Sequence, residues 1–124
     1  MKTWPVFIIL AFISCSKDGD SPKDTELPVV ILNTPANNQV FNAGQPITIS
    51  GSVTDNEYIA ELHIHVSNTN TGALLMDVHQ YPAGPGATFN QSITAVSGVN
   101  YRIQVIARDK EVNEGRSTVE VSCN

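Results

Sequence analysis

Cysteine, tryptophan and basic residues are scarce in this chain of 124 residues. It contains two cysteines and one tryptophan, and 7 Lys and Arg stand against 12 Asp and Glu, which gives a formal net charge of −5. Two cysteines are too few for a disulfide framework. Nucleic acid is bound mainly through Lys and Arg contacts to its phosphates, and the chain has no basic cluster to make them. We therefore expect no nucleic-acid partner.

Catalytic motifs are also missing. The chain has no G-x-S-x-G nucleophile elbow, no glycine-rich phosphate loop and no cysteine beside a histidine. A domain of this size also offers little concavity from which water can be excluded. Cys123 follows Val119 and Val121 with period two, which predicts a buried, unreactive thiol at the inward positions of a strand. The sequence therefore predicts that the protein is not an enzyme.

The longest apolar run lies close to the N-terminus. Lys2 supplies a positive charge, and Val6–Ile13 is uncharged and apolar but far shorter than the roughly 20 residues of a membrane-spanning helix. This pattern is typical of a secretory signal peptide. The run ends in Phe-Ile-Ser-Cys, which resembles the lipobox of bacterial lipoproteins, although Phe12 stands where leucine is usual. The resemblance implies that Cys15 is acylated and becomes the new N-terminus. The alternative is an ordinary cleaved signal with a chance cysteine.

The polar segment that follows has nothing to bury. Ser16–Asp20 is similar to the acidic stretch that follows the lipidated cysteine in lipoproteins of Bacteroidota and directs them to the cell surface. We expect residues 1–14 to be the signal peptide, residues 15–26 a flexible tether, and residues 27–124 one globular domain. The resemblance implies a lipid anchor in the outer membrane or at the cell surface, with the periplasmic side as the alternative.

Apolar residues after Leu27 alternate with period two, and no stretch has the spacing of an amphipathic helix. Clusters of Asn, Gly, Asp and Pro separate the runs, among them a turn expected at Asp55 and Asn56. Seven strands are predicted, at Val29–Leu32, Ile47–Val53, Leu62–Val66, Leu74–Val78, Phe89–Ile93, Tyr101–Ala107 and Val119–Val121. This number and spacing predict an all-β domain, a single immunoglobulin-like β-sandwich of about seven strands. A small barrel is the alternative.

Several segments resemble Ig-like, cadherin-like and fibronectin-like domains. Ser97–Val105 is similar to the approach to strand F, where a tyrosine bonds its hydroxyl back to the backbone, and Ala107–Ser117 is similar to the turn that follows. Pro28–Leu32 and Ile47–Asp55 complete a pattern typical of uncharacterised Ig-like lipoprotein domains of Bacteroidota. The resemblance implies a fold and a structural role for Tyr101, and it implies no activity.

The three histidines of the chain are expected to share one surface. Strand geometry sends Leu62, Ile64 and Val66 to the core and places Glu61, His63 and His65 on the opposite face. If the next strand folds back so that His63 faces His79, then His65 faces Asp77 and Glu61 faces Tyr81. A slip of one residue would send His79 to the core side instead. The expected metal-binding residues are Glu61, His63, His65, Asp77 and His79.

This donor set favours zinc, nickel or copper, because imidazole nitrogen and carboxylate oxygen suit these ions. The alternative is a polar outer face that binds nothing. A second, acidic group lies in loops that an Ig-like sandwich brings to one end, where cadherin-like modules bind calcium. Its expected members are Asp55, Glu57, Asp109, Glu111 and Glu114, although Asp and Asn are also common in such loops as turn formers.

The sequence thus predicts a lipid-anchored Ig-like module that acts as a non-catalytic binding or spacer domain with a protein or glycan partner. A transition-metal-binding lipoprotein is the first alternative. A glycan-binding accessory module of a surface uptake system is the second, although few aromatic residues are left for stacking on sugar rings, since aromatics make up 6% of the chain.

Overall fold

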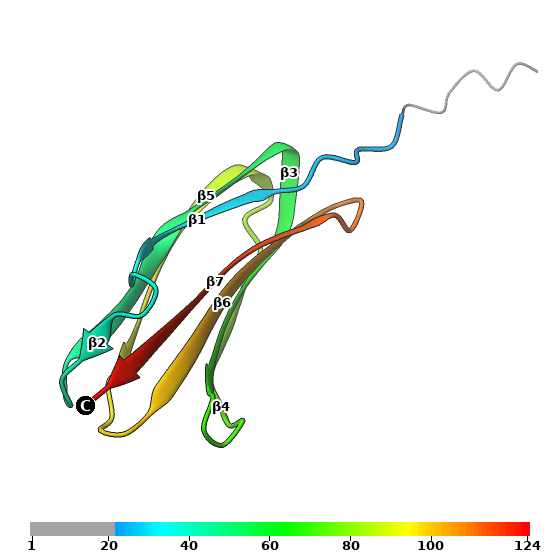
Figure 1. Cartoon of the computed structure of the whole chain (residues 1–124). Coiled ribbons are helices and arrows are strands. Elements are labelled where there is room, and N and C mark those ends of the chain that lie inside the picture. The colour runs from blue at the N-terminus through cyan, green and yellow to red at the C-terminus, as the bar shows by residue number, and fades with distance from the viewer. Residues whose placement is uncertain (1–21) are drawn as a thin grey trace, which may run out of the picture.

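A computed structural model of the chain describes residues 22–124, which form seven strands (Figure 1). The strands are β1 (Val29–Thr34), β2 (Val40–Phe41), β3 (Pro46–Asn68), β4 (Leu74–Gln80), β5 (Gly84–Thr94), β6 (Asn100–Asp109) and β7 (Glu114–Cys123). The predicted all-β domain is confirmed. No helix in the described range is long and apolar enough to span a membrane. The predicted signal peptide and Cys15 lie outside the described residues.

The strands form two layers that share the long strand β3 (Figure 1). The first half of β3 pairs antiparallel with β1 and β5, and its second half pairs antiparallel with β4 and β6. β7 continues the second layer beside β6, and the short β2 runs parallel to the end of β7. The two layers pack face to face, so the predicted Ig-like β-sandwich is confirmed.

The turn expected at Asp55 and Asn56 bends the chain without ending the strand, and this part of the prediction was wrong. Asp55 Oδ2 accepts hydrogen bonds from the backbone N–H groups of Glu57 and Tyr58, which is the local turn that aspartate favours. The pairing of β3 with β5 is interrupted between Thr54 and Ile59. β3 passes from one layer to the other here, so two expected strands are one strand with a bend.

The strand that the sequence did not predict is β2, which lies between the first two predicted strands. Its two residues are too few to show an alternating pattern. Phe41 is buried there, and it is paired with Cys123, so β2 lies along the edge of β7 at its C-terminal end.

The core lies between the layers and consists of inward-facing residues from both. Leu62, Ile64 and Val66 of β3 are completely buried, as the alternation predicted. Cys123 is also buried and is a free thiol. The other buried apolar side chains are Phe41, Ile47, Ile49, Val53, Ile59, Phe89, Ala95, Tyr101, Ile103, Val105, Ala107 and Val121.

The tyrosine corner expected before β6 is present. Tyr101 is buried, and its hydroxyl accepts a hydrogen bond of 2.8 Å from the backbone N–H of Val96. This bond satisfies a backbone group at the corner where the chain enters β6. The role of Tyr101 in this structure is therefore structural, as the resemblance implied.

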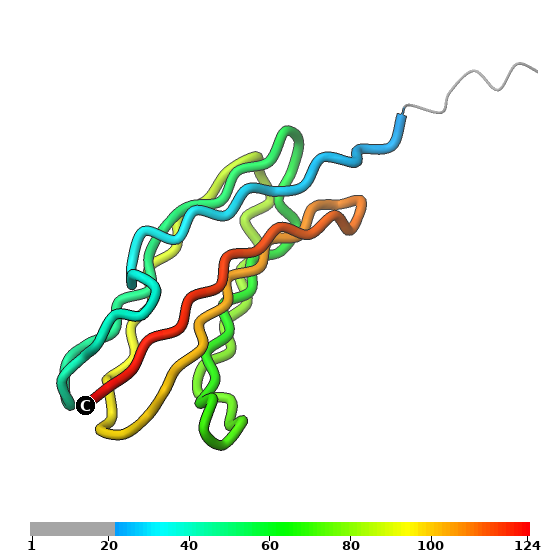
Figure 2. Tube along the Cα trace, viewed as in Figure 1, coloured from blue at the N-terminus to red at the C-terminus, as the bar shows by residue number. Residues whose placement is uncertain are grey.

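The described chain begins at one end of the sandwich, and Asn124 lies at the opposite end (Figure 2). The loop that joins β6 to β7 lies at the starting end. The turn that joins β3 to β4 lies at the same end as Asn124.

Candidate metal centre

The hairpin of β3 and β4 has the register that the sequence predicted. His63 is paired with His79 and His65 with Asp77. The turn between the strands fixes this register, because Gly72 takes a positive φ of 77° and its N–H donates to the carbonyl of Asn68. The prediction that all three histidines lie on the outer face is confirmed. We call Glu61, His63, His65, Asp77 and His79 the histidine face.

Two histidines and one carboxylate converge on this face. The Nε2–H of His63 donates a hydrogen bond to Oδ1 of Asp77, and Nε2 of His79 lies 3.1 Å from the same oxygen. The rings of His63 and His79 are stacked, with centroids 4.2 Å apart and an angle of 13° between their planes. One donor atom from each of the three residues lies within 4.8 Å of the others. This spacing suits three ligands of one metal ion.

Glu61 stands behind His79 and is not one of the converging donors. The Nδ1–H of His79 donates to Oε1 of Glu61 over 2.7 Å, and Nη1 of Arg108 lies 3.9 Å from the other oxygen. A carboxylate in this position fixes the ring and leaves Nε2 free to bind an ion. The expected pairing of Glu61 with Tyr81 is wrong, because the ladder ends at Leu62 and Gln80, and Tyr81 is 71% exposed beyond the strand.

His65 lies beside the cluster and outside it. Its ring stands edge-on to that of His63, with the centroids 5.8 Å apart. Its Nδ1 is buried and has no hydrogen-bond partner within residues 22–124. Like Glu61, His65 is thus an expected metal ligand that the structure places next to the three converging donors without joining them.

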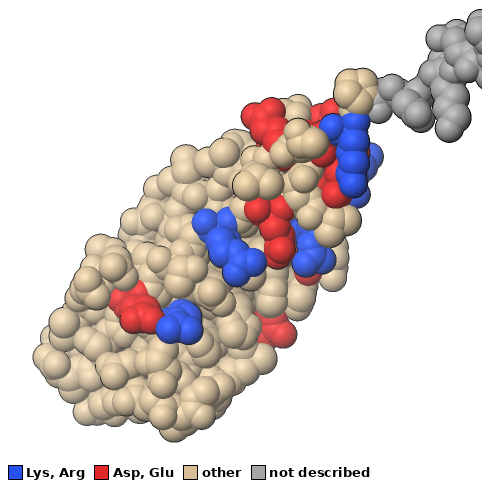
Figure 3. Space-filling view, turned by 45° about the vertical axis from the view of Figure 1, so that its right-hand side comes forward, with Lys and Arg blue, Asp and Glu red and all other residues tan. Residues whose placement is uncertain are grey.

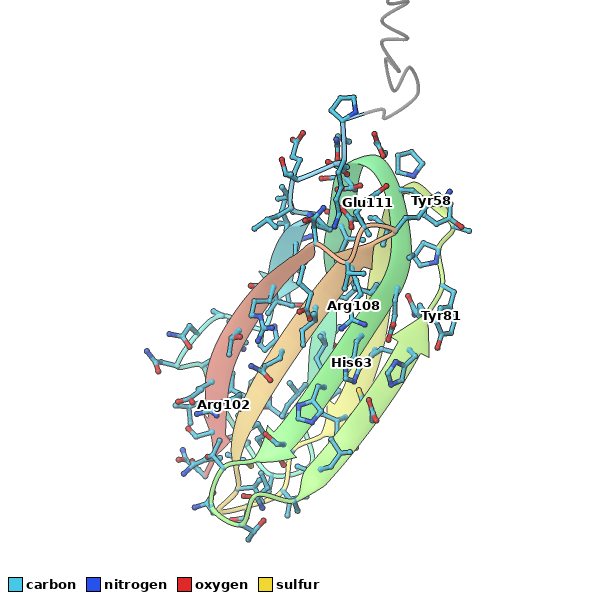
Figure 4. The ribbon with its side chains drawn as sticks, turned by 90° about the vertical axis from the view of Figure 1, so that its right-hand side faces the viewer. Tyr58, His63, Tyr81, Arg102, Arg108 and Glu111 are labelled. Atoms are coloured by element: carbon cyan, nitrogen blue, oxygen red, sulfur yellow. The ribbon has the colours of Figure 1, made fainter. Side chains whose placement is uncertain are left out.

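The histidine face is less exposed than the sequence suggested. The His63 side chain is 26% exposed and that of His79 is 40% exposed. β3 has neighbours on both sides here, so Ile106 of β6 faces His63 on one side and His79 faces it on the other. Figure 4 shows His63 in the middle of this sheet, with Arg108 beside it on β6. Partial burial strengthens the polar contacts of His63.

The contacts on the histidine face shift two pKa values. The hydrogen bond to Glu61 is the largest influence on His79 and raises its pKa above the usual value, against a smaller effect of desolvation. The hydrogen bond from His63 lowers the pKa of Asp77 below its usual value, again against desolvation. The structure therefore favours ionised Asp77, which is the form that binds a cation.

A second group of carboxylates lies at the end where the described chain begins, and Figure 3 shows charged side chains gathered toward this end. Oxygens of Asp24, Asp55 and Asp109 lie within 4.8 Å of one another, as do those of Asp24, Glu57 and Glu111. We call these five residues the acidic pole. The pKa of Glu57 is raised by desolvation and by the negative charges around it. Four of the five expected calcium ligands are thus brought together, and calcium at this pole stays a prediction.

Glu114 does not belong to the acidic pole, and its inclusion was wrong. It opens β7 and is paired with Arg108 on the outer face, where its carboxylate lies 3.6 Å from Arg108 and 3.7 Å from Arg116. The acidic pole also contains Asp24, which lies in the segment predicted to be a flexible tether and was not an expected ligand. Its carbonyl accepts a hydrogen bond from the Asn113 side chain, and its Oδ1 accepts one from Asn56. Short polar segments of this kind carry no pattern that predicts docking.

The sandwich, the tyrosine corner and the strand order define an Ig-like domain. Residues 28–121 match the family model described as "Bacterial Ig domain", and the chain belongs to this family. Domains of this family are generally non-catalytic and are often extracellular or exposed at the surface. No curated protein matches the chain.

Three solved structures illustrate the shared fold. The fibronectin(III)-like modules of CbhA from Clostridium thermocellum are 22% identical, with a TM-score of 0.52, over 77% of this chain and 94% of that one. OgpA from Akkermansia muciniphila is 8% identical with a TM-score of 0.53, and the likeness covers 79% of this chain but 29% of OgpA. A variant of superoxide reductase (neelaredoxin) from Ignicoccus hospitalis is 16% identical with a TM-score of 0.51, over 79% of this chain and 80% of that one. At these identities the likeness concerns the fold alone.

Proposed function

We propose that this protein is a non-catalytic Ig-like binding or spacer module, held at the outer membrane or cell surface by a lipid on Cys15. The observation that carries the proposal is the bacterial Ig domain that begins at residue 28, directly after the short polar segment that follows the lipobox-like sequence. The described chain enters one end of the sandwich, so the opposite end points away from an anchor on the N-terminal side (Figure 2). A partner at that end is a protein or a glycan.

The anchor is tested by replacing Cys15 with alanine. We expect the protein to move from the membrane fraction to the soluble fraction and to lose labelling by a fatty-acid probe, because the only acyl acceptor of the lipobox-like sequence is gone. Cys123→Ala is the matched control and should leave both readouts unchanged, since that thiol is buried in the sandwich. Membrane partitioning that survives Cys15→Ala would refute the lipid anchor.

A second candidate function is capture of a first-row transition-metal ion such as zinc, nickel or copper. The observation that favours it is the convergence of His63, Asp77 and His79. Glycan binding is the weaker proposal. Tyr81 is an exposed ring that a sugar could stack on, whereas the Tyr58 ring is covered by Lys110, whose Nζ lies 4.0 Å from its centroid.

Zinc titration by calorimetry tests the second candidate on the untagged protein. We expect one zinc ion per chain, and loss of binding in His63→Ala and in His79→Ala, because each removes one of three converging donors. Glu57→Ala at the distant acidic pole should bind zinc as the parent does. A parent affinity no tighter than the millimolar range would exclude metal capture and leave the spacer role. Loss of binding in His63→Ala but not in His79→Ala would mark adventitious binding to one strand.

A further inference from the structure

We infer that the metal site of the histidine face is closed by a fourth ligand, with His65 turning onto the ion that His63, Asp77 and His79 hold. This inference rests on the second candidate function and adds the coordination of the site. The resulting set of three imidazoles and one carboxylate is that of a tetrahedral zinc site. Its ligands come from two strands that are already paired.

The register brings the four ligands together. His63 and His65 are two residues apart on β3 and point to the same side, while His79 and Asp77 do the same on β4. Directly opposed side chains in an antiparallel pair have Cβ atoms about 5 Å apart. The four side chains therefore stand at the corners of one small rectangle. An ion above the centre of this rectangle would be within reach of all four. The hydrogen bond from His63 to Asp77 already runs along a diagonal of this rectangle.

His65 is the corner of the rectangle that the structure leaves unused. Its buried Nδ1 has no partner among the described residues, and a buried polar atom without a hydrogen bond is unfavourable. His79 differs, because its Nδ1 is bonded to Glu61. Turning the His65 ring toward the ion breaks no hydrogen bond at Nδ1. Nδ1 would also no longer be buried without a partner. On the β6 side, His65 is paired with Gln104, whose side chain is neutral.

Glu61 acts through His79 as a positioning residue. Its hydrogen bond holds the proton on Nδ1 and directs Nε2 toward Asp77, where the ion would replace the contact of 3.1 Å. Arg108 lies on the far side of Glu61, so that carboxylate is oriented between a cation and an imidazole. Glu61 therefore does not become the fourth ligand, and this leaves the position to His65.

A closed site has a different use from an open one. Zinc sites that act in catalysis keep a position for water or substrate, whereas structural sites fill all four positions with protein ligands. Four protein ligands therefore favour retention of the ion over catalysis on it, as befits a family that is generally non-catalytic. The ion would also join β4 to β3, and β4 has no other strand beside it among the described residues. Metal binding should thus stabilise this edge of the sandwich.

Cobalt(II) is the probe that separates closed from open coordination, because tetrahedral Co²⁺ absorbs visible light far more strongly than five- or six-coordinate Co²⁺. We expect untagged parent protein to bind one Co²⁺ with the intense tetrahedral spectrum and to release it to zinc. His65→Ala should weaken Co²⁺ binding by more than about 100-fold, which is more than the loss of a residue that only orients a ligand would cause. It should also weaken the visible absorption, because water would take the place of His65. His65→Gln is the second variant, since it keeps a polar side chain of similar length.

Two further variants serve as controls. Gln104→Ala, on the neighbouring strand opposite His65, should change neither affinity nor spectrum. Glu61→Ala should lower the affinity by about 10- to 100-fold while the tetrahedral spectrum is kept, because it orients a ligand and is not one. If both His65 variants bind Co²⁺ like the parent, the closed site is wrong and metal capture stands. If the parent binds neither Co²⁺ nor zinc, the closed site and metal capture are both wrong.

Discussion

Gly51→Ala is expected to lower the free energy of unfolding by about 3 kcal/mol, because the glycine lies where two neighbouring strands leave no room for a side chain. A Cβ atom at this position would stand 1.9 Å from the backbone carbonyl oxygen of Ile31 in β1 and 2.8 Å from the ring of Phe89 in β5. The oxygen belongs to the strand that pairs with β3, so relief requires β1 to move away. Phe89 is a buried core residue and cannot turn aside into solvent.

Gly84→Ala is the matched control, since Gly84 also lies in a strand and a Cβ there meets nothing within 4 Å. Its stability should stay within about 0.5 kcal/mol of the parent. Urea denaturation of the three proteins gives the comparison, read as the shift of the midpoint at a constant slope. Equal midpoints for Gly51→Ala and the parent would mean that β1 does not lie against β3 at this point.

The register of the histidine face was predictable because two independent constraints agree. The alternation of Leu62, Ile64 and Val66 decides which side of β3 faces the core, and a slip of one residue would bury His79. The turn around Gly72 then fixes where β4 starts. What could not be predicted is how the side chains choose partners. The strand pattern places Glu61 and Asp77 on the same face and does not say that one orients His79 while the other meets two imidazoles.

The fold was predicted in outline. The prediction was wrong at Asp55, where the chemistry of the turn and the pairing of the strands act together. Asp55 makes the turn that its residue type favours, yet the chain on either side remains in β3 because each half finds partners in a different layer. The acidic pole shows a related limit. Asp24 lies in a segment with nothing to bury, and its hydrogen bonds with Asn56 and Asn113 hold it there.

The second large effect is expected for Asp109→Ala, which should lower stability by about 3 kcal/mol at neutral pH. Asp109 is 2% exposed and opens the turn between β6 and β7. Its Oδ1 accepts from the backbone N–H of Asn113 and its Oδ2 from the Asn113 side chain, both over 2.8 Å. Hydrogen bonds to a charged group contribute about 1.5–3 kcal/mol each, and the substitution removes two of them. The turn would also lose the group that holds Asn113 in place against Asp24.

Desolvation of the Asp109 carboxylate works against this effect, and the direction of its pKa shift shows which contribution is larger. Desolvation is the largest single influence and disfavours the charge, but the hydrogen bonds to Asp109, first of all those from Asn113, together lower its pKa below the ordinary value of 3.8. A carboxyl whose pKa is lowered by folding stabilises the fold above the unfolded value, and that stability is lost as the pH falls through the folded value. The parent should therefore lose stability in acid as Asp109 becomes protonated. Asp109→Ala should not show this contribution to the loss.

Urea denaturation at neutral pH and near pH 3 separates these contributions, since that interval spans the ordinary pKa of the carboxyl. The difference in stability between the parent and Asp109→Ala should shrink in acid. Glu114→Ala is the matched control, because its carboxylate lies on the exposed sheet face beside Arg108 and Arg116, where an ion pair contributes about 0–1 kcal/mol. If Asp109→Ala is as stable as the parent at neutral pH, the hydrogen bonds to Asn113 do not stabilise this turn and the prediction is wrong. A constant difference at both pH values would show instead that packing, and not the charge of Asp109, holds this turn.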